Sequence, residues 1–173
     1  ADSGAGGSAT FGSDIDGSQA GNQSLLIDTA ASAVSLPNVG TTIALESLTV
    51  ITTGGVTLNG NIDTDDNIGT GAVDFSGSTG GITLAADTTI NSDDAGDASG
   101  GDVSFGSAVD GTGAGTESLT ITAGDGAVTF SSTVGTGTAL EELTVTTTGV
   151  VSLGGNIDTD DNGSIDYAPW AQI

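Results

Sequence analysis

The chain repeats itself at a long and a short period, and this double repeat restricts the fold more than any other feature. Residues 7–67 recur as residues 101–162, at an offset of 94 residues that becomes 95 after one inserted residue. Within this match, residues 60–67 and 155–162 are identical. A repeat of this kind indicates a solenoid in which each unit stacks on its neighbour. We therefore expect the chain to be a segment of a longer periodic array.

The short period divides each long repeat into coils. Seven triplets share the order apolar residue, hydroxyl residue, large apolar residue, and they recur at the regular spacing of a repeat architecture. They begin at Ala9, Val34, Val56, Ile82, Val103, Val128 and Val151. Each triplet is followed by a short β-branched element, and in most cases by a third strand. The chain is therefore predicted to contain about seven coils, and each long repeat four of them. The fourth coil has no obvious third strand, and residues 93–101 stand in its place.

The alternation inside each triplet predicts which side chains enter the core. In Val128-Thr129-Phe130, the first and third side chains point inward and the hydroxyl points outward, because strand side chains alternate between faces. The favoured fold is an all-β parallel β-helix, a single solenoid domain over residues 1–173 with about 21–26 residues per coil. A β-sandwich also has many short strands. It does not account for the constant order of three strand types.

If every triplet occupies the same place in its coil, the central hydroxyls form one outward row. The expected members of this row are Thr10, Ser35, Thr57, Thr83, Ser104, Thr129 and Ser152. A second face is expected to carry Thr49, Thr120 and Thr144, interrupted by Asp74 and Asp166. Such rows are typical of ice-binding surfaces, although threonine is common at exposed strand positions in general. An ice-binding or glycan-binding solenoid is therefore the alternative function.

The charge of the chain excludes several classes of partner. It contains 23 acidic residues, no Lys, Arg or His, and has a formal net charge of −23. Nucleic acid and anionic membrane surfaces would be repelled. No segment approaches the roughly 20 apolar residues of a membrane-spanning helix, so membrane insertion is not expected. Metal cations and basic protein surfaces remain as partners, and high acidity also favours solubility.

The acidic loops are the candidate metal sites, and calcium is the candidate cofactor. Residues 158–166 resemble the start of a calcium-binding loop, although Pro169 stands where the bidentate Glu would be. The loops after Ile62 and Ile90 are expected at one corner of adjacent coils, where their carboxylates repel unless a cation intervenes. Solvated turns are the simpler alternative. The candidate ligands are Asp63, Asp65, Asp66, Asn67, Asp93, Asp94, Asp97, Asp158, Asp160, Asn162, Ser164 and Asp166.

Catalysis is not expected of this chain. A nucleophile–base pair needs a His or Lys partner, and the chain has neither. Asp74 and Asp166 are the carboxylates expected to point outward from strands, and the predicted coils place them too far apart to act together. Near the end of the sequence, Tyr167 and Trp170 would either close the bore of the solenoid or stack on a sugar.

The order Val-Thr-Phe, a β-branched pair, a Gly-rich turn and Ser-Leu-Thr-Val recurs over residues 7–167. This pattern resembles the β-strand repeats of filamentous-haemagglutinin-type adhesins and autotransporter passengers. The resemblance implies an exported, right-handed β-helix at a bacterial cell surface, used in adhesion, biofilm or filament formation. Separately, the open strand edges of a solenoid cut within a repeat favour assembly with copies of itself, head-to-tail or by strand edges, or excision from a longer chain. A host or matrix glycan or protein is the other expected partner. The motifs encode the coil and name no receptor.

Overall fold

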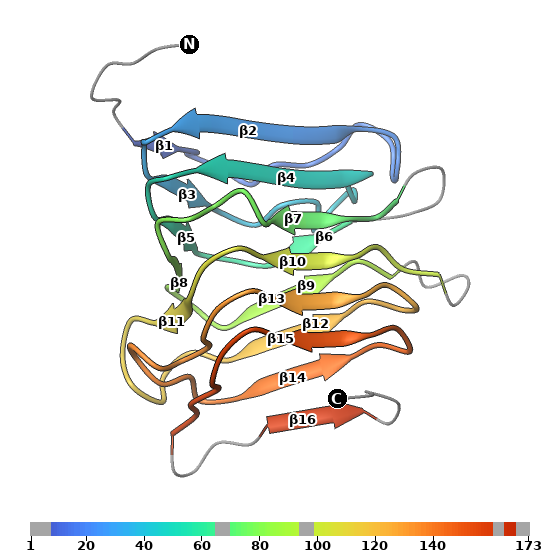
Figure 1. Ribbon diagram of the computed structural model, residues 1–173. Coiled ribbons are helices and arrows are strands. Elements are labelled where there is room, and N and C mark those ends of the chain that lie inside the picture. The colour runs from blue at the N-terminus through green and yellow to red at the C-terminus, as the bar shows by residue number, and fades with distance from the viewer. Residues whose placement is uncertain (1–7, 65–69, 94–98, 161–164, 169–173) are drawn as a thin grey trace.

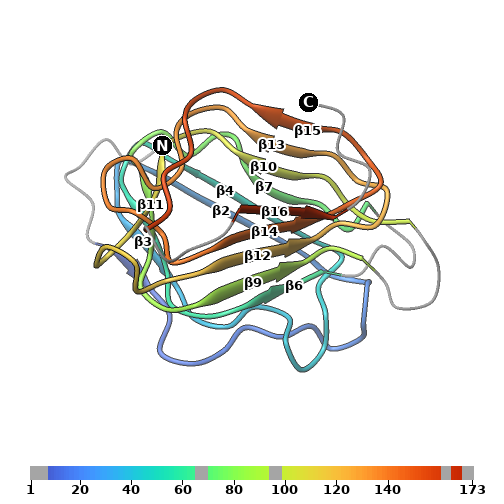
Figure 2. The ribbon, with the colours of Figure 1, turned by 90° about the horizontal axis from the view of Figure 1, so that it is seen from below.

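The protein is a parallel β-solenoid, as Figures 1 and 2 show in two directions. The computed structural model describes residues 8–64, 70–93 and 99–160, and the backbone of residues 165–168. Within these ranges it contains strands and no helix, so no helix there could span a membrane. Three sheets, named A, B and C, run along the axis, and the chain passes through them in the constant order A, B, C. The fold predicted from the repeat is confirmed.

The ladders that join the strands of each sheet are all parallel. Sheet A contains β1 (Ala9–Thr10), β3 (Val34–Leu36), β5 (Val56–Leu58), β8 (Ile82–Leu84) and β11 (Val109–Gly111). Sheet B contains β6 (Ile62–Asp63), β9 (Thr88–Asn91), β12 (Leu119–Thr122), β14 (Leu143–Thr146) and β16 (Ile165–Ala168). Sheet C contains β2 (Ser24–Ala30), β4 (Ser47–Thr52), β7 (Val73–Phe75), β10 (Val103–Phe105), β13 (Val128–Phe130) and β15 (Val151–Leu153).

The strands form about five turns, fewer than the seven expected. The difference arises because some rungs are isolated bridges rather than strands, namely those at Ile15, Val39, Val134 and Ile157. Around the fourth coil, the separation between paired residues also exceeds the 21–26 residues that the triplet spacing predicts. It is 28 residues from Ile62 to Ile90, 30 from Val73 to Val103, 27 from Ile82 to Val109 and 31 from Ile90 to Ile121.

The seven triplets do not share one face, which corrects the predicted row of hydroxyls. Thr10, Ser35, Thr57 and Thr83 stack in sheet A, and the next rung there is Asp110. Ser104, Thr129 and Ser152 lie in sheet C, below Asp74 and Thr49. Thr120 and Thr144 lie in sheet B with Asp166.

The cause of this change of face is a third strand in the fourth coil that the sequence pattern did not reveal. Strand β10 fills that place, because Val103 pairs with Val73 of sheet C and not with Ile82 of sheet A. Every later triplet therefore lies one face earlier in the order A, B, C than a repeat of four complete coils would place it.

The core is a column of apolar side chains inside the three sheets. Most triplets show the predicted burial, with the first and third residues buried and the middle one partly exposed. Phe75, Phe105 and Phe130 stack along sheet C, with ring centroids 5.8 Å and 4.9 Å apart and rings within 14° and 3° of parallel. Leu36, Leu58 and Leu84 hold the same inward position in sheet A and are fully buried.

Candidate functional site: the acidic corners

The two loops expected to share a calcium ion do begin at one corner of adjacent coils. Ile62 pairs with Ile90 in sheet B, so the loops that follow them leave the sheet side by side. The residue opposite Asp63 is Asn91 and not an acid, and the Asn91 side-chain amide donates to the Asp63 carboxylate at 3.0 Å. Asp93 lies in a bridge to Gly100. Asp65, Asp66, Asn67, Asp94 and Asp97 lie outside the described residues.

The loop after Ile157 is at a different corner. Ile157 continues sheet A by its bridge to Val134, so this loop connects sheets A and B. Asp158 and Asp160 are both exposed, and their backbone N–H groups donate to Val134 and Leu140 of the preceding coil at 2.8 Å each. The backbone of Asp166 pairs with Thr144. Asn162 and Ser164 lie outside the described residues.

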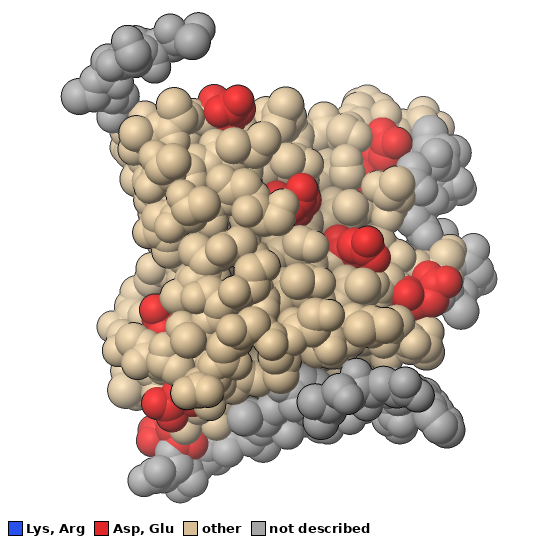
Figure 3. Space-filling view, in the orientation of Figure 1, with Lys and Arg blue, Asp and Glu red and all other residues tan. Residues whose placement is uncertain are grey.

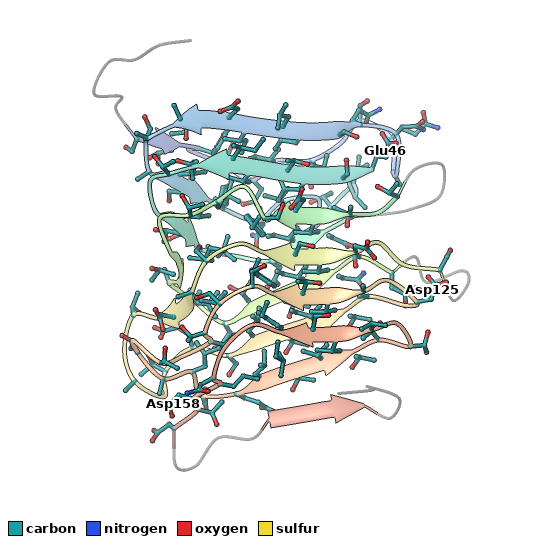
Figure 4. The ribbon with its side chains drawn as sticks, in the orientation of Figure 1. Glu46, Asp125 and Asp158 are labelled. Carbon is teal, nitrogen blue, oxygen red and sulfur yellow. The ribbon has the colours of Figure 1, made fainter. Side chains whose placement is uncertain are left out.

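Across the described ranges, no three acidic side chains are grouped so that they could hold a metal ion. The acidic residues visible in Figure 3 are scattered over the surface rather than gathered in one patch. Figure 4 shows the same dispersion, with Glu46 and Asp125 on one side of the rod and Asp158 on the other.

Several carboxylates have a structural role that the sequence did not reveal, because they accept backbone hydrogen bonds from an adjacent coil. The carboxylate of Asp87 accepts from the N–H of Ser118 at 3.0 Å, and that of Asp102 accepts from Ala127 at 2.8 Å. Asp125 accepts from Gly100 at 2.9 Å. A charged acceptor makes a stronger bond to a backbone N–H than a neutral one. Some of the acidic side chains therefore serve as hydrogen-bond acceptors for backbone N–H groups at the corners, which lie outside the strand ladders.

The most regular of these contacts occurs once in each long repeat. Asp16 accepts from the N–H groups of Thr42 and Ile43 at 2.9 Å and 3.3 Å. Asp110, its equivalent in the second long repeat, accepts from Gly137 and Thr138 at the same two distances. The Thr42 N–H is the largest influence on the pKa of Asp16 and, with Ile43, holds it below the ordinary aspartate value. An Asp-Gly pair begins both loops, which is the sequence signal for this contact.

A second corner contact uses an amide in one repeat and a carboxylate in the other. The Gln23 side-chain oxygen accepts from the N–H groups of Ser18 and Gln19 at 2.9 Å and 3.2 Å. Glu117 accepts from Thr112 and Gly113 at 2.9 Å and 3.2 Å, and also from the Thr112 hydroxyl. Either side chain therefore closes the same turn.

Glu117 is only 7% exposed, and its surroundings favour the charged form. Burial is the largest single influence on the pKa of Glu117 and raises it. Hydrogen bonds from the hydroxyls of Thr112 and Thr116 and from the N–H groups of Gly113 and Thr112 outweigh burial, so the pKa lies below the ordinary glutamate value. A carboxylate with a lowered pKa stabilises the fold above its unfolded pKa, and this contribution is lost as pH falls through the folded pKa.

We expect Glu117→Gln to keep the turn intact at neutral pH, because Gln23 already closes the equivalent turn. Glu117→Ala is expected to lower the free energy of unfolding by about 1–3 kcal/mol, because two backbone donors lose their acceptor. Urea unfolding at pH 7 and at pH 4 measures both effects. Glu117→Gln should show a smaller loss of stability between these pH values than the unaltered chain. Equal losses in the two proteins would refute the assigned role of the charge.

Ala30 has a strained backbone that its repeat equivalent avoids. It has φ of 55°, and its equivalent in the second long repeat is Gly124, with φ of 50°. Both carbonyls accept from the next coil, Ala30 from Thr53 at 2.6 Å and Gly124 from Thr148 at 2.7 Å. The left-handed conformation costs a residue with a Cβ about 1–2 kcal/mol, whereas glycine adopts it freely.

We expect Ala30→Gly to stabilise the protein by about 0.5–1 kcal/mol, the relieved strain less the entropy that glycine adds to the unfolded chain. Gly124→Ala should be destabilising, because its Cβ would lie 2.8 Å from the Ser99 carbonyl oxygen at the same φ. Thermal unfolding of the two single variants checks both signs. A destabilised Ala30→Gly protein would show that this backbone is not strained.

Sheet B carries two adjacent columns of outward polar side chains. One column contains Thr89, Thr120 and Thr144, and the other contains Asn91, Thr122 and Thr146. Asp63 stands opposite Asn91 at one end of the second column. The backbone of Asp166 pairs with that of Thr144 beyond the first. The sequence predicted that Thr120 and Thr144 share a face, as they do. The paired columns were missed because residues 88–91 were expected on another face and Thr122 and Thr146 were not considered.

No protein-family model matches the chain, and the searches of curated proteins and of solved structures found no match either. The geometry by itself establishes the fold, a parallel β-solenoid.

Proposed function

We propose that the chain is a structural and adhesive segment of a secreted repeat protein, forming or decorating a filament at the cell surface. The observation that carries the proposal is the repeated construction of the same corners. The hydrogen bonds around Asp16 recur around Asp110 with the same lengths, and those around Gln23 recur around Glu117. Such repetition favours extension of a rod, whereas an enzyme needs one specialised place.

The acidic surface supports an extracellular location and a role for cations. With 23 acidic residues and no Lys, Arg or His, the long-range interactions between side-chain charges are repulsive. We propose that calcium, which prefers carboxylate and carbonyl oxygens, reduces this repulsion at the acidic corners. The loops after Ile62 and Ile90 are the first place to look, because their strands are paired neighbours.

Salt should raise the melting temperature of this protein, because it screens like charges and there are no side-chain ion pairs for it to weaken. At equal ionic strength, calcium is expected to raise it further than magnesium or sodium. A specific site adds about 2.7 kcal/mol when free calcium exceeds the dissociation constant 100-fold. Thermal unfolding in the three salts makes the comparison. Identical unfolding curves in the three salts would mean that charge screening is the only effect of the salts, and would contradict the calcium proposal.

The structural part of the proposal is tested by electron microscopy with millimolar calcium and then with a chelator. Filaments that form with calcium and separate without it support a cation-stabilised fibre assembled from copies of the chain. Isolated short rods under both conditions, at high protein concentration, contradict self-assembly.

The adhesive part needs a separate measurement with a control of equal charge. Beads coated with the protein are passed over extracted extracellular matrix, and beads coated with a Gly135→Ala variant, which keeps the net charge but disrupts a corner, serve as the control. Greater retention of the first beads supports adhesion by the folded surface. Equal retention contradicts it.

An ice-binding solenoid is the second candidate, and the paired columns of sheet B are the surface that favours it. Thr120, Thr122, Thr144 and Thr146 form a regular array of hydroxyl and methyl groups on adjacent parallel strands. Thermal hysteresis and ice-crystal shaping measure this activity directly. Absence of both in the folded protein would remove the candidate.

A further inference from the structure

The long sequence repeat is not a whole number of coils. Val34 pairs with Val56 in sheet A, whereas Val128, its equivalent in the second long repeat, pairs with Val103 and Val151 in sheet C. Leu25 lies in sheet C, and its equivalent Leu119 lies in sheet B. Equivalent residues therefore lie on different faces, although the hydrogen bonds around them are the same.

The number of rungs in one repeat explains this displacement. From Val34 to Val128 the chain makes eleven steps between faces, ending on the rungs at Val39, Leu48, Val56, Ile62, Val73, Ile82, Ile90, Val103, Val109, Ile121 and Val128. Four complete coils would need twelve rungs. One repeat is therefore three and two-thirds coils, and the next repeat begins one face earlier in the winding.

The core accepts this displacement because the three faces present similar side chains to the bore. Inward Leu36 of sheet A corresponds to inward Phe130 of sheet C, and both are buried. The corners are equally interchangeable. Gly40 lies on the connection from sheet B to sheet C, its equivalent Gly135 lies on the connection from sheet A to sheet B, and their φ values are nearly equal (+73° and +71°).

We propose that this unit extends by eleven rungs at a time, and that a tandem array of it has no dedicated binding face. Each unit turns its corner loops by one third of a turn relative to the unit before it. A given loop returns to the same side after three units, or eleven coils, which is about 53 Å at the usual spacing of β-strands. The inference stands whether or not the rod is adhesive.

The register is tested first in the present chain, which has no cysteine of its own. Asp74 and Ser104 are outward neighbours in sheet C, so Asp74→Cys with Ser104→Cys should form a disulfide on mild oxidation. Thr83→Cys with Ser104→Cys is the matched pair, because a whole-coil repeat would make those two residues the neighbours. Disulfide formation in the second pair and not the first would overturn the proposal.

The rule of extension is tested by lengthening the chain. Residues 8–101 are inserted again between Gly101 and Asp102, which adds one long repeat and eleven rungs. The control inserts residues 34–108 again after Ala108. This adds nine rungs, or three complete coils, so every later residue keeps its original sheet. We expect both proteins to fold, with the rod longer by about 18 Å and about 14 Å respectively in small-angle X-ray scattering. Folding of the control alone contradicts interchangeable faces.

The rotation itself is measured with pairs of spin labels in the lengthened chain. Labels are attached through cysteines at Ser18, at the inserted copy of Ser18, and at Thr112, which are three equivalent positions. Three labels on one side would be collinear, so the longest distance would equal the sum of the other two. The expected result is a longest distance clearly smaller than that sum, because the labels lie at three different corners. Collinear labels would overturn the rotating display of loops.

Discussion

Replacing Phe105 by alanine is expected to lower the free energy of unfolding by about 3–5 kcal/mol, the largest side-chain effect in the core. Its ring is fully buried and stacks on Phe75 on one side and on Phe130 on the other. Removing it leaves a cavity in the middle of the column and ends both ring contacts, which contribute beyond their buried area. Urea unfolding of the variant and of the unaltered protein gives the difference.

Two further variants separate the stack from simple burial. Phe105→Leu should cost far less than Phe105→Ala, because Leu36, Leu58 and Leu84 fill the same inward position in sheet A. Phe11→Ala should also be mild, because Phe11 is only partly buried and lies at the edge of the core. An equal loss for Phe11→Ala and Phe105→Ala would contradict a continuous aromatic column as the source of stability.

The aromatic column shows which part of the fold could be predicted from the sequence. The inward direction of Phe105 and Phe130 followed from strand alternation within their triplets, which is a local property. Which rings meet depends on the face to which each triplet belongs. That assignment requires counting rungs through the loop between Asn91 and Val103, where no apolar triplet marks a strand. Phe75 precedes the loop and Phe105 follows it, so their contact could not be predicted from the sequence of either strand alone.

Less of the candidate site could be predicted, because its contacts also join residues of different coils. That the loops after Ile62 and Ile90 share a corner followed from coil spacing and is confirmed by the strand pairing. The asparagine opposite Asp63 was missed, because the expected cluster was built from the acidic residues of the two loops alone. Carboxylates such as Asp102 and Asp125 were overlooked as acceptors, since their donors are backbone groups of another coil that lie far away in the sequence.

Gly135→Ala is expected to lower the free energy of unfolding by about 2–5 kcal/mol, because it combines two separate costs. The residue has φ of +71°, which is unfavourable once a Cβ is present. An added Cβ would also lie 1.9 Å from the carbonyl oxygen of Asp158 in the next coil, so one of the two backbones must move. The Gly135 N–H donates to Val109 of the preceding coil at 2.7 Å, which leaves little freedom to shift. Chemical unfolding measures the loss.

The equivalent glycine provides an independent test of the same geometry. Gly40 has φ of +73°, and a Cβ added to it would lie 2.0 Å from the carbonyl oxygen of Asp63. Its N–H donates to the carbonyl of Ile15 at 2.7 Å. Gly40→Ala should therefore cost about as much as Gly135→Ala, although the two residues lie at different corners. Gly12→Ala is the control and should change stability by less than about 0.5 kcal/mol, since Gly12 is exposed with no atom within 4 Å of its added Cβ. Similar losses at Gly40 and Gly135 would mean that a corner keeps its energetics when it moves to another face, which is the condition for extending the rod by eleven rungs at a time.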